Sequence, residues 1–316
     1  MPESIRNADG SPYDGRDDIR LGPVTVLTGL DQGRYPHGNS VLLQGAEQSL
    51  LVDPSMSLDL RSGPLAARVD QIFNSHAHED HVASNRLFPS APVYIHEADL
   101  PGVQDIDGLL SIYGFDDPAV TEHFRQVLED EFQFAGSPDA VGVTSDAVFD
   151  LGGGVRTEVV HLPGHTRGHC GVMVPSAGVC YLGDIDLSGF GPYYGDAWSS
   201  LDDFRRTLAL CRDLEADFYV TFHHKHVVEG RAAFLGQLAD FTDVIARRDD
   251  ELLAFLAEPR TLQDIVAHRF VYRPTVDDPM VDSVERRSMS QHLDSLLAAG
   301  QVTCEGEGLW RRGGGG

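Results

Sequence analysis

The sequence predicts a mixed α/β protein, of the α+β type, with a large N-terminal domain and a small C-terminal one. In the N-terminal part, short apolar runs are separated by Gly, Asn or Asp, a pattern typical of strands and turns. Further strand patterns then mix with amphipathic helical ones, without the regular alternation of a βαβ protein. After about residue 247 the pattern changes to two helices followed by two short strands.

The expected elements follow the apolar periodicity along the chain. Apolar runs bounded by turn residues predict strands at 24–27, 40–43, 49–52, 71–74, 93–96, 147–149, 155–162, 170–174, 178–182 and 218–222. Helical spacing predicts helices at 58–69, 118–134, 200–214 and 229–257, the last in one piece or two. Many strands therefore precede the longer helices.

The chain has 316 residues, which suits one large domain or two unequal ones. We expect a flexible arm at 1–20, a catalytic domain at 21–246, a small domain at 247–312 and a flexible glycine tail at 313–316. In the small domain Thr261 is an N-cap, and a second amphipathic helix within 288–300 stops at Gly300. Two helices followed by a small β-hairpin predict a winged-helix-like fold.

The charge balance excludes some classes of function. Lys and Arg total 24, whereas Asp and Glu total 49, which gives a formal net charge of −25. Binding to nucleic acid or to an anionic membrane needs a basic surface, so we expect neither partner. No run reaches about 18 apolar residues, the N-terminus lacks a signal-peptide layout, and the cysteines show no CxxC spacing. These features predict a cytoplasmic protein without a membrane segment.

The chemistry concentrates in a short segment that directly follows the predicted strand at 71–74. His76, His78, Asp80 and His81 lie within six residues. Side chains alternate along a strand end, so His76 and His78 project from the same side. A turn into a helix then brings Asp80 and His81 toward a second position. Because imidazole and carboxylate groups are metal ligands, the segment can serve two adjacent cations.

Other polar residues follow other predicted strands. His165 and His169 follow one strand, Asp184 follows the next, and His223 and His224 follow a later one. A scaffold typically presents its site just past the carboxyl ends of strands. A lone histidine at such a place is usually structural. Together with the first cluster, however, these residues indicate one shared metal centre.

The combined pattern resembles the metallo-β-lactamase superfamily. The resemblance rests on His76-x-His78-x-Asp80-His81, on Gly164-His165, on Gly183-Asp184 and on a final histidine at a strand end, and it covers roughly residues 22–250. It implies an αββα sandwich of two mixed sheets flanked by helices, with a site for two metals. The C-terminal extension resembles that of the subgroup around β-lactamase-like protein 2 and the glyoxalase II-type thioesterases.

The resemblance implies a role for each ligand. His76, His78 and His165 would bind the first metal, and Asp184 would bridge both metals. Zinc is the expected metal, with iron and manganese as alternatives, because this ligand set accepts several divalent ions.

The second metal would be bound by Asp80, His81 and the last histidine of the pattern. The last ligand stays open at this point. Counting from the preceding strand favours His223, whereas counting back from the following residues favours His224. His226 is a weaker third candidate.

The resemblance also places residues around the ligands. Asp53 matches the first acidic motif of the family and would support the centre from behind. His169 would help to hold the loop that carries His165. Tyr193 or Tyr194 could line the pocket and donate a hydrogen bond to a substrate oxyanion. The segment 100–134 is expected to form an apolar lid.

These features predict a dinuclear-metal hydrolase. A water acidified between two cations would attack, as hydroxide, the carbonyl carbon of a small ester, thioester or lactone. Asp80 would orient this nucleophile or shuttle its proton. The expected partner is a small-molecule substrate, and a homodimer is compatible with the sequence.

Two alternatives remain. One is a metal-dependent nuclease of the same superfamily that acts on single-stranded RNA or DNA. Residues 260–312 argue against it, because they contain 7 basic and 8 acidic residues, and no Lys or Arg lies between 288 and 300. The other is a non-catalytic binding or regulatory member, which the complete ligand set opposes.

Overall fold

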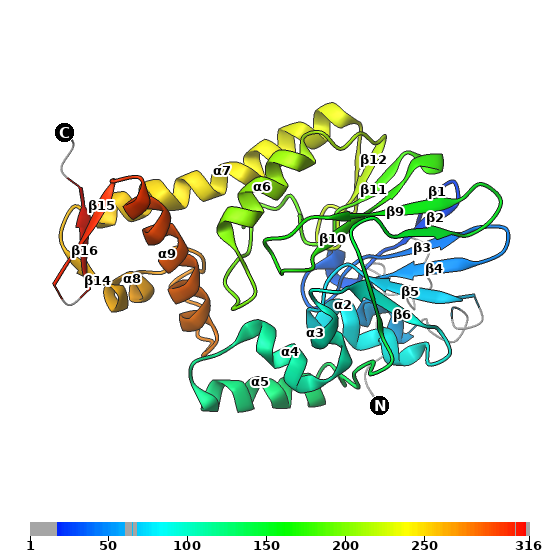
Figure 1. Cartoon of the computed structure of the whole chain (residues 1–316), viewed down its shortest axis with the longest axis horizontal. Helices are drawn as coiled ribbons and strands as arrows, with labels where there is room; N and C mark the ends of the chain where they lie inside the picture. The colour runs from blue at the N-terminus through cyan, green and yellow to red at the C-terminus, as the bar shows by residue number, and fades with distance from the viewer. Residues whose placement is uncertain (1–17, 61–64, 66–67, 307, 314–316) are drawn as a thin grey trace.

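Two mixed β-sheets pack face to face between two layers of helices in the computed structural model, which describes residues 18–60, 65, 68–306 and 308–313 (Figure 1). The first sheet has the order β1-β2-β3-β4-β5-β6-β7, antiparallel from β1 to β4 and parallel from β4 to β7. Its strands are β1 (Ile19–Leu21), β2 (Val24–Leu27), β3 (Ser40–Gln44), β4 (Ser49–Val52), β5 (Gln71–Asn74), β6 (Val93–His96) and β7 (Val141–Val143).

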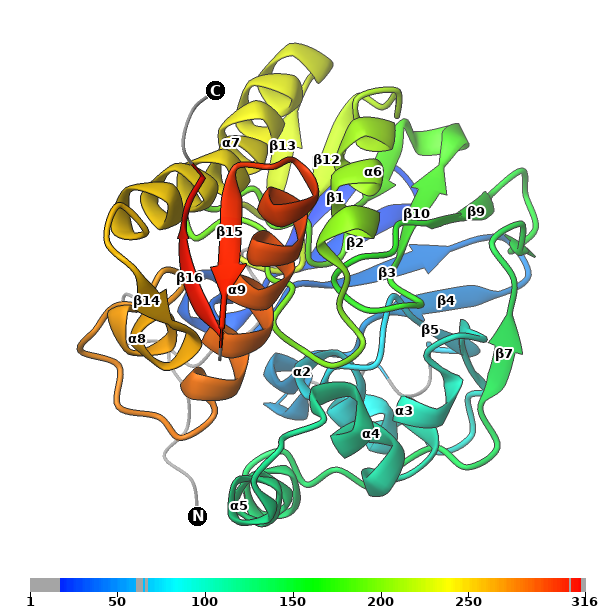
Figure 2. The ribbon, with the colours of Figure 1, turned by 60° about the vertical axis from the view of Figure 1, so that its left-hand side comes forward.

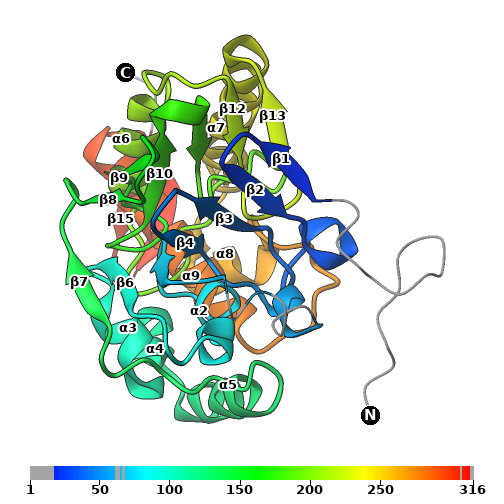
Figure 3. The same ribbon diagram turned by 90° about the vertical axis from the view of Figure 1, so that its right-hand side faces the viewer.

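The second sheet has the order β13-β12-β11-β10-β9-β8. Neighbouring strands are antiparallel except for β11 and β12, which are parallel. Figure 3 shows this sheet beside β1–β4 of the first one. Its strands are β8 (Val148–Asp150), β9 (Arg156–His161), β10 (Cys170–Val174), β11 (Val179–Tyr181), β12 (Phe218–Val220) and β13 (Val227–Glu229).

Helices cover the outer face of each sheet. On the first sheet lie α3 (Leu100–Gln104), α4 (Ile106–Tyr113) and α5 (Pro118–Asp130), and on the second lie α6 (Leu201–Cys211) and α7 (Arg231–Phe255). The predicted αββα sandwich is therefore confirmed.

Central strands such as β4, β5 and β11 are buried on both faces, which explains why they appear as continuous apolar runs in the sequence. In β5, Phe73 points between the sheets, whereas Ile72 points to the helices of the outer layer. In β4, Leu50 and Val52 face the other sheet, and Leu51 faces outward. This alternation fixes the register of each strand, because a slip by one residue would exchange the two apolar layers.

The C-terminal region lies at the far end of α7 (Figures 1 and 2). It consists of β14 (Arg260–Thr261), α8 (Leu262–His268), α9 (Val281–Ala298), β15 (Val302–Glu305) and β16 (Leu309–Arg312), and its sheet has the order β14-β16-β15. The expected cap is present, because Thr261 and Asp264 form a capping box. The winged-helix-like fold stays a prediction, as does the boundary at residue 247, where α7 runs on without a break.

Some elements differ from those expected. The expected arm at 1–20 extends too far, because Ile19–Leu21 pairs with β2 as strand β1. Residues 1–17 and the tail at 314–316 lie outside the described residues. Of the helix expected at 58–69, the structure describes a 3-10 helix at Met56–Leu60 and a helical residue at Leu65, whereas 61–64 and 66–67 lie outside the described residues. Strands β7 and β13 were not expected. No described helix is long and apolar enough to cross a membrane.

Candidate active site

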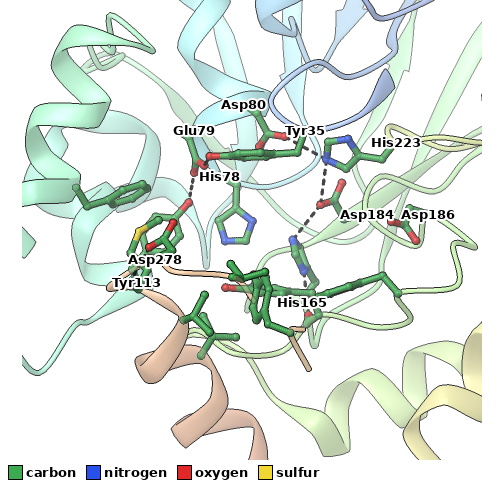
Figure 4. A pocket seen from close by; sticks show the side chains of 18 of the residues that line it. Tyr35, His78, Glu79, Asp80, Tyr113, His165, Asp184, Asp186, His223 and Asp278 are labelled. Atoms are coloured by element: carbon green, nitrogen blue, oxygen red, sulfur yellow. Dashed lines mark hydrogen bonds and ion pairs between the residues drawn. The ribbon is translucent and has the colours of Figure 1, made fainter. Parts of the chain in front are cut away.

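The expected ligands come together at one edge of the sandwich, because each lies just after the carboxyl end of a strand. His76 and His78 follow β5, and Asp80 and His81 belong to the short helix α2 (Glu79–Val82) that comes next. The remaining ligands follow strands of the second sheet: His165 follows β9, Asp184 follows β11, and His223 follows β12. The two sheets therefore supply the two halves of the site (Figure 4).

The ligand atoms form two adjoining clusters. One contains His76, His78, His165 and Asp184, and the other contains Asp80, His81 and His223. Within each cluster the ligand atoms lie within 4.8 Å of one another. In the first, for example, the Nε2 atom of His76 lies 3.0 Å from Nδ1 of His78 and 3.2 Å from Nε2 of His165.

Asp184 lies between the two clusters. Its Oδ2 atom is 3.3 Å from Nε2 of His165 in the first cluster and 3.9 Å from Nε2 of His223 in the second. Its Oδ1 atom is 3.0 Å from Nε2 of His81. This position suits the predicted bridging role, which stays a prediction.

The residues present fit a pair of metal ions. Asp80 Oδ2, His81 Nε2 and Asp184 Oδ1 are buried polar atoms that make no hydrogen bond within the described part of the chain. Burying such atoms without a hydrogen bond is costly, so their arrangement fits cations that they could ligate. Neutral imidazole nitrogens and carboxylate oxygens are also the donors that zinc, iron and manganese accept.

The ring of each ligand histidine is oriented by a contact that its second nitrogen makes outside the cluster. In the first cluster, Nδ1 of His165 lies 3.0 Å from the carbonyl oxygen of Tyr193, and Nε2 of His78 lies 2.9 Å from Oδ2 of Asp196. In the second, Nδ1 of His223 lies 2.9 Å from the carbonyl oxygen of Gly33. Such partners fix the tautomer and leave the other nitrogen free for a metal.

Asp53 lies behind the second cluster and contacts His81. This fully buried carboxylate accepts hydrogen bonds from the backbone N–H and hydroxyl of Ser75 and from the hydroxyl of Tyr181, each at 2.6 Å. It also lies 2.9 Å from Nδ1 of His81. Asp53 therefore holds the His81 ring with Nε2 pointing into the second cluster.

His169 contacts the backbone on either side of the centre, on its own loop and on the loop of Asp184. Its Nδ1 atom lies 2.9 Å from the carbonyl oxygen of Leu162, and its Nε2 atom accepts a hydrogen bond from the backbone N–H of Asp184 at 3.0 Å. Burial lowers the pKa of His169 to about 3, so the ring stays neutral and keeps this acceptor. His169 thus positions the loop of Asp184 as well as the loop on which it lies.

The glycines that precede two ligands are required by the geometry. Gly164 has a φ of +131°, and a Cβ atom there would lie 2.4 Å from the backbone of Phe204. Gly183 has a φ of +55°, and a Cβ atom there would lie 2.6 Å from Nε2 of His169. Only glycine combines this backbone conformation with such close contacts. This explains the Gly-His and Gly-Asp pairs of the sequence.

The carboxylates control the charge of the ligand histidines. Burial lowers the pKa of His223, but Asp184 and Asp80 outweigh this effect and raise the pKa to about 9. Burial likewise lowers the pKa of His78, and its hydrogen bond to Asp196 reverses the shift and raises the pKa to about 9. Burial raises the pKa of Asp184, but His81 and His223 hold it well below its usual range. The site is therefore arranged to pair carboxylates with cations.

The structure distinguishes the two candidates for the last ligand. His223 is buried, and its Nε2 atom lies 3.1 Å from Oδ2 of Asp80. His224 is exposed to solvent at the rim and does not belong to either cluster. His226, the third candidate, has its Nδ1 atom 2.8 Å from Oδ1 of Asn39 instead.

We predict that His223→Ala and His224→Ala differ in metal content. His223→Ala removes a cluster atom, so the protein is expected to hold about one metal ion per chain instead of two. His224→Ala should keep both ions, because the ring lies outside the clusters. Elemental analysis of the two purified variants checks this difference. If only His224→Ala lost a metal ion, His224 rather than His223 would be the ligand.

The comparisons with known proteins agree with this geometry. Residues 34–224 match the sequence profile of the metallo-beta-lactamase superfamily, which is more than half of the chain. The chain belongs to the metallo-β-lactamase superfamily. No protein of curated function matches the sequence.

Two solved structures show that the similarity extends beyond the metallo-β-lactamase core. The metallo-beta-lactamase family protein TTHA1429 from Thermus thermophilus is 23% identical, with a TM-score of 0.67 over 88% of this chain and 95% of that chain. A beta-lactamase domain protein from Burkholderia ambifaria is 19% identical, with a TM-score of 0.70 over 96% of each chain. At this level of identity the likeness concerns the fold, and in the second case it includes most of the C-terminal region.

Two carboxylates of this metallo-β-lactamase centre were not predicted. Asp196 contacts His78, as described above. Asp99 is fully buried and accepts hydrogen bonds from the hydroxyl of Thr166 at 2.6 Å and from the backbone N–H groups of Gly168 and Ala77 at 2.7 and 3.3 Å. It therefore ties together two ligand loops that lie far apart in the sequence. Neither residue stands in a motif, so only the tertiary contacts reveal them.

A cavity of about 450 Å³ opens onto the ligand atoms. Tyr193 lines it as expected, and its hydroxyl donates to Oδ1 of Asp196 at 2.9 Å. The expectation for Tyr194 is wrong, because its side chain turns away from the cavity. It is almost fully buried, and its hydroxyl contacts Arg248 at 2.9 Å and His292 at 2.7 Å.

The segment expected as an apolar lid supplies one wall of the cavity, and its role as a lid stays a prediction. Tyr113, Phe115 and Phe124 from α4, α5 and their connection line it, and Tyr113 and Phe124 are buried in the core below the first sheet. A second wall was not predicted: it comes from the C-terminal region, with Tyr272 and Met280 among the lining residues.

Proposed function

We propose that the chain is a metal-dependent hydrolase that cleaves a small ester, thioester or lactone. One observation carries this proposal. Two adjoining ligand clusters, with three buried polar atoms that lack hydrogen bonds, form the floor of a cavity whose walls are largely apolar. A small carbonyl compound can place its reacting carbon on this floor and its apolar part between the walls.

The chain's own residues would hold the metals and move the proton. His76, His78, His165 and Asp184 would hold one divalent cation, and the second cluster would hold the other. When bound, such a pair supplies Lewis-acid polarisation of a carbonyl and acidification of water. Zinc is the proposed metal, with iron and manganese as alternatives.

Asp80 is the proposed catalytic carboxylate. It is buried at the cavity floor, and its Oδ2 atom makes no hydrogen bond within the described residues. Burial raises the pKa of Asp80, but His81 and His223 outweigh this effect and lower it. Asp80 therefore starts as a carboxylate that can orient a water molecule and accept its proton.

Two alternatives are less well supported. Cleavage of RNA or DNA needs cationic side chains for the phosphates, and no Lys or Arg lines the cavity within the described part of the chain. A non-catalytic binding role leaves the two complete ligand clusters without a use. The proposed substrate is accordingly a small molecule.

The C-terminal region contributes to the proposed substrate site. Tyr272, Met280 and Val284 bring it into the cavity wall. We therefore place the protein near the subgroup of β-lactamase-like protein 2 and the glyoxalase II-type enzymes, in which a winged-helix-like extension shapes the site.

We predict that hydrolysis depends on about two metal ions per chain. Chelation should abolish turnover in a panel of aryl esters, thioesters and lactones, and added zinc, iron or manganese should restore it. Elemental analysis before and after chelation gives the metal content. Full turnover by the chelated protein would contradict the proposal, as would a reloaded protein that hydrolyses no member of the panel.

A further inference from the structure

We propose that the enzyme selects substrates whose organic part is uncharged and apolar, and that it discriminates against substrates carrying a carboxylate or phosphate. This inference rests on the proposed function and names the substrate class of the same site. The walls of the cavity, the sign of its charges and the state of its hydrogen-bond donors carry it.

Three segments of the chain contribute apolar side chains to the cavity walls. Phe115 and Phe124 come from the α4–α5 segment, Phe190 comes from the loop after β11, and Met280 and Val284 come from the C-terminal region. Figure 4 shows how the lining side chains surround the space in front of the labelled ligands. An apolar acyl or alcohol group is stabilised here because its surface is removed from water.

Apart from the histidines, the charged side chains of the described cavity walls are carboxylates. Besides the ligand carboxylates, Glu79, Asp186 and Asp278 line the cavity, whereas no described Lys or Arg does. The cationic neighbours of His224 do not change this. Arg34 is not part of the lining, and Lys225 borders a separate surface hollow. A negatively charged substrate group would therefore meet charges of its own sign.

Three of the four tyrosine hydroxyls among the described lining residues are already used as donors. Tyr35 donates to Oε1 of Glu79 at 2.8 Å, and Tyr113 donates to Oε2 of the same carboxylate. Tyr193 donates to Asp196. These phenols can still accept a hydrogen bond, but they have no proton left for a substrate anion.

An anionic group between these walls would lose hydration and gain no lysine, no arginine and few free hydroxyl donors from the described lining residues. Buried charge without compensation is costly, and like charges at short range add to the cost. A neutral apolar group meets neither penalty. Selection thus comes from repulsion of one class as much as from attraction of the other. We expect a difference of at least about tenfold in kcat/KM between matched substrates.

The first test compares two esters of equal length. The para-nitrophenyl esters of hexanoic acid and of adipic acid have the same acyl chain length, and only the second ends in a carboxylate. The metal-loaded enzyme should cleave the hexanoate at least about tenfold better in kcat/KM. Equal values, or a preference for the adipate ester, would overturn the inference.

The second test introduces a positive charge at the mouth of the cavity. Val276 lines the cavity and is 37% exposed, so a longer side chain can be placed there without disturbing the core. Val276→Arg should raise kcat/KM for the adipate ester by about tenfold relative to the hexanoate. Val276→Gln, which is polar but uncharged, is the matched control and should leave the ratio unchanged. A ratio that is the same in both variants would contradict an electrostatic origin.

The third test does not need turnover. Hexanethiol and mercaptohexanoate can be titrated into the cobalt-loaded protein, where thiolate binding gives a visible charge-transfer band. The uncharged thiol should bind at least about tenfold more tightly. If neither ester is cleaved, the proposed function fails, and the thiol pair still decides the charge preference. Tighter binding of the carboxylated thiol would overturn it.

Discussion

Asp184→Ala is expected to abolish hydrolysis almost completely. This change removes the carboxylate that lies between the two clusters, with Oδ1 3.0 Å from His81 and Oδ2 3.3 Å from His165. Because both clusters lose a negatively charged neighbour, the metal content should fall below two ions per chain. The loss in turnover should reach about a hundred- to thousandfold, the size typical when one main electrostatic group of an active site is removed. Elemental analysis and steady-state kinetics on one preparation check both effects.

A matched control separates this effect from general loss of acidic charge. Asp213 is exposed after α6, far from either cluster, and Asp213→Asn should keep both metals and the full rate. The alanine variant should also remain folded, because Gly183 still sets the backbone of the loop. If Asp184→Ala kept two metal ions and its turnover, a central role for this carboxylate would be wrong.

The ligands were predictable because their chemistry is local in sequence. The spacing of His76, His78, Asp80 and His81 has few uses other than metal binding, and glycine before His165 and Asp184 marks a sharp turn at a strand end. Burial of both faces of the strands also left a clear apolar signal, as in β4 and β5. The sandwich and the position of the site follow from these signals together.

The supporting residues were not predictable, because their contacts are distant in sequence. Asp99 and Asp196 contact ligand segments that lie 22 and 118 positions away in the chain. A lone Asp in a loop has no periodicity or spacing that separates it from a solvated one. The contrast between Tyr193 and Tyr194 has the same origin, since adjacent residues in an irregular loop point in directions that only packing decides. The choice between His223 and His224 likewise needed the buried contact with Asp80.

The C-terminal half of the chain supports the first metal cluster from a distance. Arg248 on α7 is almost fully buried and donates to the carbonyl oxygen of Pro192 at 2.7 Å and to that of Phe190 at 2.9 Å. It also contacts the hydroxyl of Tyr194. The loop held in this way then supplies Asp196 to His78. One guanidinium thus fixes the backbone that orients the first cluster, while the second cluster has its own supports.

Arg248→Met should therefore weaken the first cluster selectively. The variant leaves two buried carbonyls without a donor, so we expect the free energy of unfolding to fall by about 3 kcal/mol. The loop should also hold His78 and His165 less firmly, which lowers metal affinity or activity by about 10- to 100-fold. Titration with zinc should show one site of unchanged affinity and one that is weaker.

Arg247 provides the matched control, because it is the exposed neighbour of Arg248 on the same helix. Arg247→Met removes the same charge from α7 but contacts none of the loop carbonyls described above, so stability and both metal affinities should stay unchanged. If Arg248→Met weakened both metal sites equally, the effect would be general destabilisation. If it weakened neither, the loop would be held by other contacts. Only a selective loss of affinity at the first metal site would show that the Arg248 guanidinium acts through the Tyr193–Asp196 loop. This loop contacts His78 and His165.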